Sequence, residues 1–265
     1  MTAHRTGILT SASLMVGAPA AADAVARARR LPALKVGLHL VLADGAPVLP
    51  PSELPALLDR AGRFRSDMAA VGLRIFLDPA ARRQVAREIA AQFEAFAATG
   101  LPLDHVDCHK HFHLHPTIGN LVIAIGQRFG MRALRVPNEP VGVLRRIEPA
   151  ARAPQSLVVA AYAARLRTRL RRHGLRTCDR VFGLAWSGAM TEPRIAGLLA
   201  NLPEGVTEIY THPATSNSFA GAAPGYRYAE ETAALVAPRV VAAAKSGGMR
   251  LIGYSDLSEN PALMS

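Results

Sequence analysis

The stretch that decides the fold is LKVGLHLVL, residues 34–42. Its apolar side chains are nearly continuous, which is typical of a strand that is covered on both faces, as in parallel sheets. A second run of this kind, LDHVDCH at residues 103–109, predicts another strand. We expect further strands at residues 132–136, 206–211 and 249–254.

Helical patterns separate these runs. Asp78 followed by Pro79 predicts an N-cap and the first turn of a helix that ends before Gly100. Two more helices are expected at residues 116–129 and 229–245, and residues 138–154 are expected to form a long loop. Strands that alternate with helices favour an α/β fold with a parallel sheet. Periodicity alone does not separate a closed barrel from an open doubly wound sheet.

Composition narrows the class of protein. Of the 265 residues, 50% are hydrophobic and 19% charged, so the chain can bury a core. Two cysteines, Cys108 and Cys178, do not make a disulfide framework, and we expect a cytoplasmic protein. No window approaches the roughly 20 apolar residues of a membrane span. The glycine-rich and metalloprotease motifs of nucleotide-binding proteins, serine hydrolases and zinc proteases are absent from the sequence.

The strongest local signal is the histidine-rich segment HVDCHKHFHLHP at residues 105–116, which holds five of the nine histidines. If its start is extended, His105, Asp107 and His109 share one face of the strand. Parallel α/β folds place their chemistry at the carboxyl ends of strands, and neutral imidazole is the commonest protein ligand for metals. We therefore predict a functional site here. The alternative is a histidine-rich turn that binds metal only adventitiously.

Two isolated histidines lie in similar contexts. His39 is a polar residue inside an apolar strand, which by itself is typical of a hydrogen-bonded core histidine. Next to His109 it would instead be a second member of a site. His212 ends another predicted strand and precedes Pro213, either as an ordinary strand-to-loop junction or as a group that gives a proton to a leaving group.

Six segments carry a wider pattern: GILTSASLMV (7–16), VGLHLVL (36–42), HVDCHKHFHLHP (105–116), ALRVP (133–137), EIYTHPA (208–214) and RLIGYSDL (250–257). Together they resemble the YdjC-like (ChbG-type) carbohydrate deacetylases, and within that family the hopanoid-biosynthesis-associated HpnK group. The resemblance implies one deacetylase domain over residues 1–265 with a distorted TIM-like (β/α) barrel of about seven strands.

The same resemblance implies a hydrolase that removes acetyl groups from N-acetylated amino sugars with one divalent metal ion, Mg²⁺ or Zn²⁺. It implies that His39 and His109 bind the metal and that His212 is a catalytic proton donor. We expect Asp107 to be catalytic too, by orienting a histidine or assisting proton transfer.

Three more residues, His111, His113 and Arg135, are expected to contact the substrate. Family members open with a strand that ends in N-A-D-D-F-G, whose aspartates supply a metal ligand and a general base. This motif is not in the sequence, so we expect a domain that is truncated at its N-terminus and lacks the first strand. A start codon assigned too late, a truncated gene or a degenerate form would each explain this, and the intact remaining motifs favour the late start. Asp23 and Asp44 lie in the wrong context to replace those aspartates.

Arginines supply much of the formal net charge of +11. Six of them fall within residues 165–176, directly after the apolar residues 157–164. On a helix, Arg165, Arg169 and Arg172 would share one face, with Leu166 and Leu170 on another. This pattern is compatible with a solvated helix face or with a patch that contacts an anionic membrane surface. Nucleic acid is a weaker candidate because only 5% of the residues are aromatic.

The resemblance to the HpnK group also implies the substrate, an N-acetylglucosaminyl sugar on a hopanoid lipid. Such an enzyme would work at the inner face of the membrane as a peripheral protein, and a homodimer is left open. A soluble chito-oligosaccharide is the rival substrate. The rival function is a catalytically inactive barrel that serves as a basic binding protein for membranes or nucleic acid.

Overall fold

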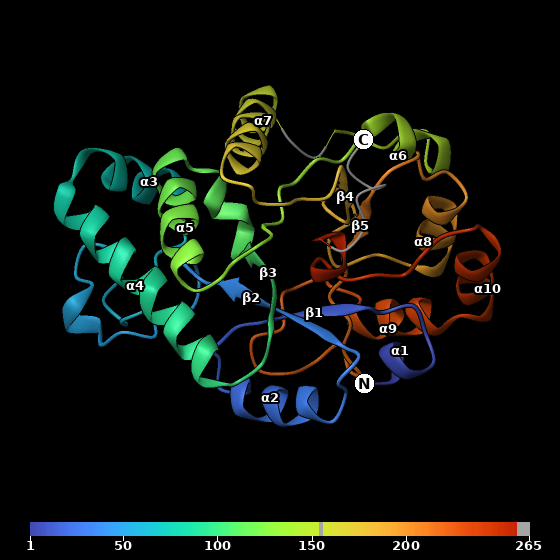
Figure 1. Cartoon of the computed structure of the whole chain (residues 1–265), viewed down its shortest axis with the longest axis horizontal. Helices are drawn as coiled ribbons and strands as arrows, with labels where there is room; N and C mark the ends of the chain where they lie inside the picture. The colour runs from blue at the N-terminus through green and yellow to red at the C-terminus, as the bar shows by residue number, and fades with distance from the viewer. Residues whose placement is uncertain (154–155, 259–265) are drawn as a thin grey trace.

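The computed structural model describes residues 1–153 and 156–258, and its strands form two parallel sheets (Figure 1). The first sheet has the order β1 (Ser11–Leu14), β2 (Lys35–Leu40), β3 (Leu103–Cys108). The second pairs β4 (Arg180–Phe182) with β5 (Thr207–Ile209). The fold is therefore mixed α/β with parallel sheets, as the sequence predicts. A barrel of about seven strands is not seen, because the described residues form sheets of three and two strands.

The expected strand at residues 132–136 lies between the two sheets but is not a strand. Single bridges pair Val106 with Leu134 and Ala133 with Arg176, both parallel. The backbone N–H of Val181 donates to the Asn138 carbonyl, which continues the connection toward β4. The segment thus occupies the place of a strand while making only isolated hydrogen bonds, and Pro137, which has no N–H to donate, directly follows it.

Helices surround the strands. Figure 1 shows α3, α4 and α5 on one side and α6, α8, α9 and α10 on the other. Their bounds, with those of the 3-10 helices, are α1 (Thr2–Arg5), α2 (Ala21–Arg29), η1 (Pro51–Glu53), α3 (Met68–Leu77), α4 (Pro79–Ala98), η2 (His109–Leu114), α5 (Pro116–Arg128), α6 (Val141–Ile147), α7 (Leu157–Arg172), α8 (Glu192–Leu199), α9 (Tyr228–Val236), α10 (Pro238–Ser246) and η3 (Ser255–Ser258).

Helix α4 confirms the capping prediction, since the Asp78 carboxylate accepts the backbone N–H of Ala80 at 2.7 Å. The expected helix at residues 229–245 is wrong as a single element. It divides into α9 and α10 at Ala237, whose backbone is extended (φ −59°, ψ 131°), because Pro238 starts a new first turn. The loop expected at residues 138–154 contains α6, and Pro154 lies outside the described residues.

The expected strand at residues 249–254 is also wrong. At its end the backbone bonds to a side chain and not to a neighbouring strand. The Asp104 carboxylate accepts the backbone N–H groups of Tyr254 and Ser255, at 3.2 and 2.8 Å. Asp256 likewise accepts the N–H of Gly253 at 2.7 Å. These side-chain acceptors satisfy the donors that a strand would give to its neighbours.

Each sheet has its own core. The larger apolar cluster packs β2 and β3 against α4 and α5, and includes Leu38, Val106, Ile89 and Phe93. The second cluster packs Phe182 of β4 against α8, α9 and α10. Among the described residues we find no helix with the length and apolar character needed to cross a bilayer.

Candidate active site

The site begins where β2 and β3 run side by side. The sheet register places His39 opposite Asp107, so both side chains lie on the same face. The Nδ1–H of His39 donates to Asp107 Oδ2 at 2.9 Å. Asp107 is only 1% exposed. Its carboxylate therefore fixes which nitrogen of His39 carries the proton and leaves Nε2 free to bind something else.

The chain turns sharply after β3. Lys110 and His111 both have positive φ angles, 53° and 54°, an arrangement that costs energy for residues other than glycine. This turn brings the His109 ring to 5.7 Å from that of His39, measured between centroids. The next ring, His111, lies 6.0 Å from Tyr210 at the end of β5. Strained backbone of this kind clusters at functional sites, which supports the prediction for this segment.

His212 reaches the same group from the second sheet. Its ring lies between Tyr210 and Tyr226, at centroid distances of 5.6 and 5.2 Å. Its backbone N–H donates to the carboxylate of Glu231, a fully buried residue of α9 that also accepts the Met190 N–H at 2.9 Å. The position of His212 is thus set by a buried carboxylate, because β5 ends at Ile209.

Three histidines, His109, His111 and His212, are neutral near pH 7. Burial, reinforced by the neighbouring His39, lowers the pKa of His109 to about 4. Burial lowers the pKa of His212 to about 4 and that of His111 to about 3. Neutral imidazole is the form that binds metals and accepts protons, so these rings are prepared for either role.

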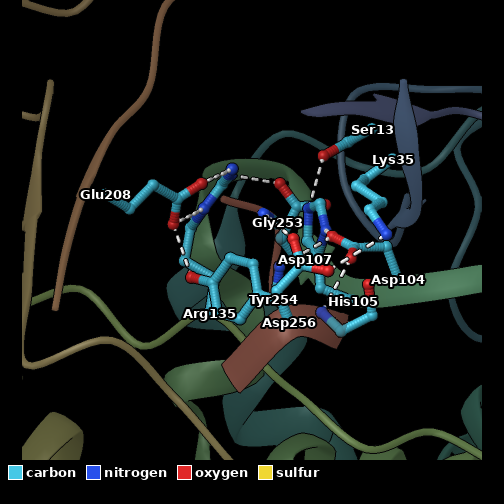
Figure 2. Close-up of polar contacts among 11 residues, drawn as sticks. Ser13, Lys35, Asp104, His105, Asp107, Arg135, Glu208, Gly253, Tyr254 and Asp256 are labelled. Atoms are coloured by element: carbon cyan, nitrogen blue, oxygen red, sulfur yellow. Dashed lines mark hydrogen bonds and ion pairs between the residues drawn. The ribbon is translucent and has the colours of Figure 1, made fainter. Parts of the chain in front are cut away.

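Arg135 links the two sheets at the site (Figure 2). Its Nη1 donates to Asp107 Oδ2, and its Nε and Nη2 donate to the Glu208 carboxylate on β5 at 2.9 and 2.5 Å. Burial by itself would raise the pKa of Asp107, but the charges of Arg135 and His39 outweigh it and hold that pKa well below its usual range. The guanidinium expected to contact substrate is 8% exposed and binds two carboxylates.

The other expected substrate contacts lie in different surroundings. His113 is fully buried, and its Nε2–H donates to the carbonyl of Arg135 at 2.8 Å, so it supports the site from within the core. His111 is half-buried and lines a cavity beside the site. Of the three, His111 is placed where a ligand can reach it.

His105, which shares the predicted face with Asp107 and His109, is hydrogen-bonded to Asp104 and joins the network of Glu208 and Arg135 through Tyr254 (Figure 2). Its Nδ1–H donates to Asp104 at 2.8 Å, and the Ser13 hydroxyl lies 3.1 Å from its Nε2. The ring stacks on Tyr254 and lies so close to β2 that a Cβ on Gly37 would sit 2.5 Å from it. With 1% of its surface exposed, His105 ties β1, β2 and β3 to the chain near Tyr254.

A divalent metal would find two suitable ligands here. His39 and His109 are adjacent imidazoles, one of them oriented by a carboxylate, and this donor set fits Zn²⁺ in part, whereas Mg²⁺ prefers oxygen ligands. Within the described residues no group of three His, Cys, Asp or Glu side chains is arranged to hold an ion. Asp44, which follows β2, pairs with Lys110 beside His109.

The sequence does not identify the residues whose side chains position Arg135 and His212. Glu208 and Tyr254 lie within two of the motifs above and Glu231 lies outside them, and the sequence predicts no role for any of the three. Glu231 sits in an ordinary amphipathic helix, where a glutamate is usually solvent-exposed. A weak signal was present for Glu208, since it precedes His212 by four residues at a predicted strand.

Comparisons with known proteins indicate the family of the chain. A family model described as YdjC-like protein matches residues 1–246. A carbohydrate deacetylase from Geobacillus stearothermophilus is 31% identical over 258 residues, covering 96% of this chain and 89% of that protein. One from Brevibacillus brevis is 40% identical over 127 residues, 48% of each chain. A crystal structure from Enterococcus faecalis V583, described as that of a candidate cellobiose-phosphate cleavage protein, superimposes with a TM-score of 0.73 at 25% identity, covering 96% of this chain and 90% of that one.

Proposed function

Because the chain belongs to the YdjC-like family, we propose that it is a carbohydrate deacetylase, which hydrolyses the N-acetyl group of an amino sugar. One observation carries the proposal. Three distant segments contribute to it: the rings of His39 and His109 lie beside the buried carboxylate of Asp107, and His212 lies close enough for both of those histidines, in addition to burial, to lower its pKa. Relatives named carbohydrate deacetylase support the same reaction class.

His212 has the properties of the proton-transfer group. Burial and the positive charge of Arg135 keep its imidazole neutral, with a pKa of about 4. A neutral imidazole takes a proton from the attacking water and then returns it to the departing amine. Tyr210 and Tyr226 flank the ring and restrict where it points.

Asp107 acts through His39. By accepting the Nδ1–H, it holds the ring in the tautomer whose Nε2 lone pair faces away from the strand pair. His39 and His109 would hold a divalent ion, Mg²⁺ or Zn²⁺, which when bound polarises an acetyl carbonyl and acidifies water. Asp107 orients the His39 ring, and burial keeps His109 unprotonated near pH 7, with a pKa of about 4.

For the substrate, we propose an amino sugar carried on a lipid, of the glycosylated hopanoid type. A cavity of about 350 Å³ opens beside His111 and is lined mainly by apolar side chains, among them Met68, Phe112, Val159 and Tyr162. Because His111 borders both this cavity and the histidine group, an apolar substituent of the sugar has a place next to the reacting end.

Helix α7 supports contact with a membrane surface. Leu157 and Val158 at its start are 90% and 64% exposed, and Arg165, Arg169 and Arg172 are exposed farther along. Leu166 and Leu170 are buried, as the helical pattern predicts. Arginines near anionic lipid contribute about 1 kcal/mol each, so this helix would hold the protein at the cytoplasmic face of the membrane.

The test is acetate release from two substrates, N-acetylglucosaminyl hopanoid in anionic vesicles and soluble diacetylchitobiose, with Mg²⁺ or Zn²⁺ supplied. We expect His212→Ala to lower the rate at least about 100-fold, the range of a lost acid–base group, and His109→Ala to lower it at least as much because a metal ligand is lost. His173→Ala, an exposed histidine at the end of α7, is the matched control and should be unchanged.

The outcomes separate the alternatives. Acetate release from both substrates at equal rates would remove the lipid from the proposal and leave the deacetylase. Release from neither, with the vesicles still bound, would favour the non-catalytic basic binding protein. Vesicle binding that survives neutralisation of the three α7 arginines and high salt would contradict the membrane role of that helix.

A further inference from the structure

Both carboxylate oxygens of Glu208 accept hydrogen bonds, and the donors are Arg135 and Tyr254 rather than the histidines of the site. Its Oε1 accepts Arg135 Nη2 at 2.5 Å, and its Oε2 accepts Arg135 Nε at 2.9 Å. The Tyr254 hydroxyl donates to the same Oε2 at 2.5 Å. A carboxylate that binds a guanidinium through two parallel hydrogen bonds fixes its plane as well as its distance. Figure 2 shows Glu208, Arg135 and Asp107 following one another in this order.

The remaining contact of the guanidinium is directed into the site. Arg135 Nη1 donates to Asp107 Oδ2, the oxygen that also accepts the Nδ1–H of His39. A chain of contacts therefore runs from β5 through Arg135 to β3 and on to β2. The orientation of His39 on the first sheet depends in this way on a carboxylate of the second.

The two oxygens of Asp107 are used unequally. Oδ2 accepts both donors, whereas Oδ1 is buried with no hydrogen-bond partner among the described residues. The carboxylate therefore has one preferred rotation, which lasts only while Arg135 stays on the side of Oδ2. If the guanidinium moved, Asp107 could turn Oδ1 toward it, and His39 would lose its acceptor.

We propose that Glu208 is a positioning residue of the site: it holds Arg135 in the one orientation that keeps Asp107 Oδ2 on His39 Nδ1. Tyr254 contributes by holding Oε2 of Glu208 from the opposite side. The competing explanation is that the Glu208–Arg135 pair only ties the two sheets together. The kinetic part of the proposal rests on the proposed deacetylase function, and the structural part does not.

The test compares Glu208→Gln with a matched control. Glu148 also binds an arginine through both oxygens, with Arg194 Nε at 2.7 Å and Nη2 at 3.2 Å, and accepts an aromatic donor, Trp186 Nε1, at 3.1 Å. Glu148→Gln therefore makes the same chemical change at a pair away from the histidines. Tyr254→Phe removes a single donor from Glu208 and serves as the milder second variant if Glu208→Gln folds poorly.

The first readout needs no activity. In the metal-free parent chain, the ring-nitrogen NMR shifts of His39, identified by their loss in His39→Gln, should show one tautomer with the proton on Nδ1. Glu208→Gln should convert this signal to a mixture of tautomers, and Tyr254→Phe should shift it less in the same direction. Glu148→Gln should leave it unchanged.

The second readout is kinetic. Glu208→Gln should lower kcat for acetate release by about 10–100-fold, typical of residues that orient a ligand, with KM within about twofold. An unchanged His39 spectrum and unchanged kcat, together with a lower Tm, would overturn the proposal and leave a structural tie. If the parent chain releases no acetate while the His39 signal still responds, the deacetylase function fails and the positioning role stands.

Discussion

The two sheets hold their functional residues by different means. In the three-stranded sheet, His39 and Asp107 lie opposite each other on paired strands, so the backbone ladder sets their spacing. In the two-stranded sheet, β4 and β5 have three residues each, and His212 lies beyond the ladder. There buried carboxylates set the loops: Glu139 accepts the N–H groups of residues 183–185, and Glu231 those of Met190 and His212.

The difference lies in how many groups each position depends on. A strand residue is held by several backbone hydrogen bonds, so no single side chain decides its place. A loop held by a carboxylate depends on that one residue, and each N–H left without its acceptor costs about 1–3 kcal/mol. The second region is therefore the more sensitive to single substitutions, and the contacts that join it to the first region should be the most sensitive of all.

The largest effect on the unfolding free energy is expected at Arg135, which joins the two sheets. Arg135→Met removes the cation that binds both Asp107 and Glu208 and leaves the buried Asp107 carboxylate without it. Losing one partner of a buried ion pair costs about 3–5 kcal/mol, measured as the change in unfolding free energy by urea denaturation. Arg194→Met, at a more exposed pair with Glu148, should cost about 1 kcal/mol or less. If both variants lost the same unfolding free energy, Arg135 would contribute no more than an ordinary surface ion pair, and its role in joining the two sheets would be contradicted.

The second largest effect is expected on acidification, which should lower the unfolding free energy through His113, next to the three-stranded sheet. Burial lowers the pKa of His113 to about 4, and its hydrogen bond to the Arg135 carbonyl only partly opposes this. Because the folded pKa is below the unfolded value of about 6.5, the unfolded chain binds more protons between these values. The stabilisation is complete above about pH 6.5 and is lost as pH falls toward 4, on the order of 3 kcal/mol for this one group.

The measurement is the unfolding free energy at several pH values for the parent chain and for His113→Gln. The variant should be less stable at pH 7 yet lose less on acidification. His173→Gln, in which an exposed histidine is replaced, should keep the slope of the parent chain. A slope that His113→Gln leaves unchanged would contradict the assignment of this pH dependence to His113.

A matched pair of glutamates compares the two regions directly. Glu88 on α4 and Glu231 on α9 are both fully buried, and each accepts two backbone N–H groups. Replacing either with glutamine turns one acceptor into a donor that faces an N–H, which should cost about 1–3 kcal/mol. We expect only Glu231→Gln to lower kcat as well, because one of its donors is the backbone of His212. Equal kcat values for the two variants would mean that the carboxylate anchor does not set the histidine.

The same contrast explains what the sequence could predict. Residues 34–42 and 103–109 were recognised as strands because continuous apolar runs such as Leu38–Leu40 record burial on both faces, and β2 and β3 lie within them. Residues 249–254 are equally apolar in part, but the Tyr254 N–H goes to the side chain of Asp104, 150 positions away in sequence. No local pattern records a partner that distant.

The site follows the same rule. His109 and His212 are predicted from sequence because they follow predicted strands, whereas His39, inside β2, is predicted only as a partner of His109. Glu208, Tyr254 and Glu231 act through other residues, and glutamate or tyrosine in a strand or helix is ordinary in sequence. Their roles become visible only when the contacts are known, such as the 2.5 Å hydrogen bond from Tyr254 to Glu208.

The smallest effect on the unfolding free energy is expected at the exposed arginines of α7, which take no part in positioning the residues of either sheet. Arg165, Arg169 and Arg172 are exposed, so replacing all three with glutamine should change the unfolding free energy by no more than about 0.5 kcal/mol per site. Acetate release from soluble diacetylchitobiose should also be unchanged, since the site lies elsewhere. Release from a vesicle-borne substrate should fall and become less sensitive to salt, because the attraction to anionic lipid is lost. A large drop in Tm would instead show that these arginines stabilise the fold, and the surface role of α7 would have to be given up.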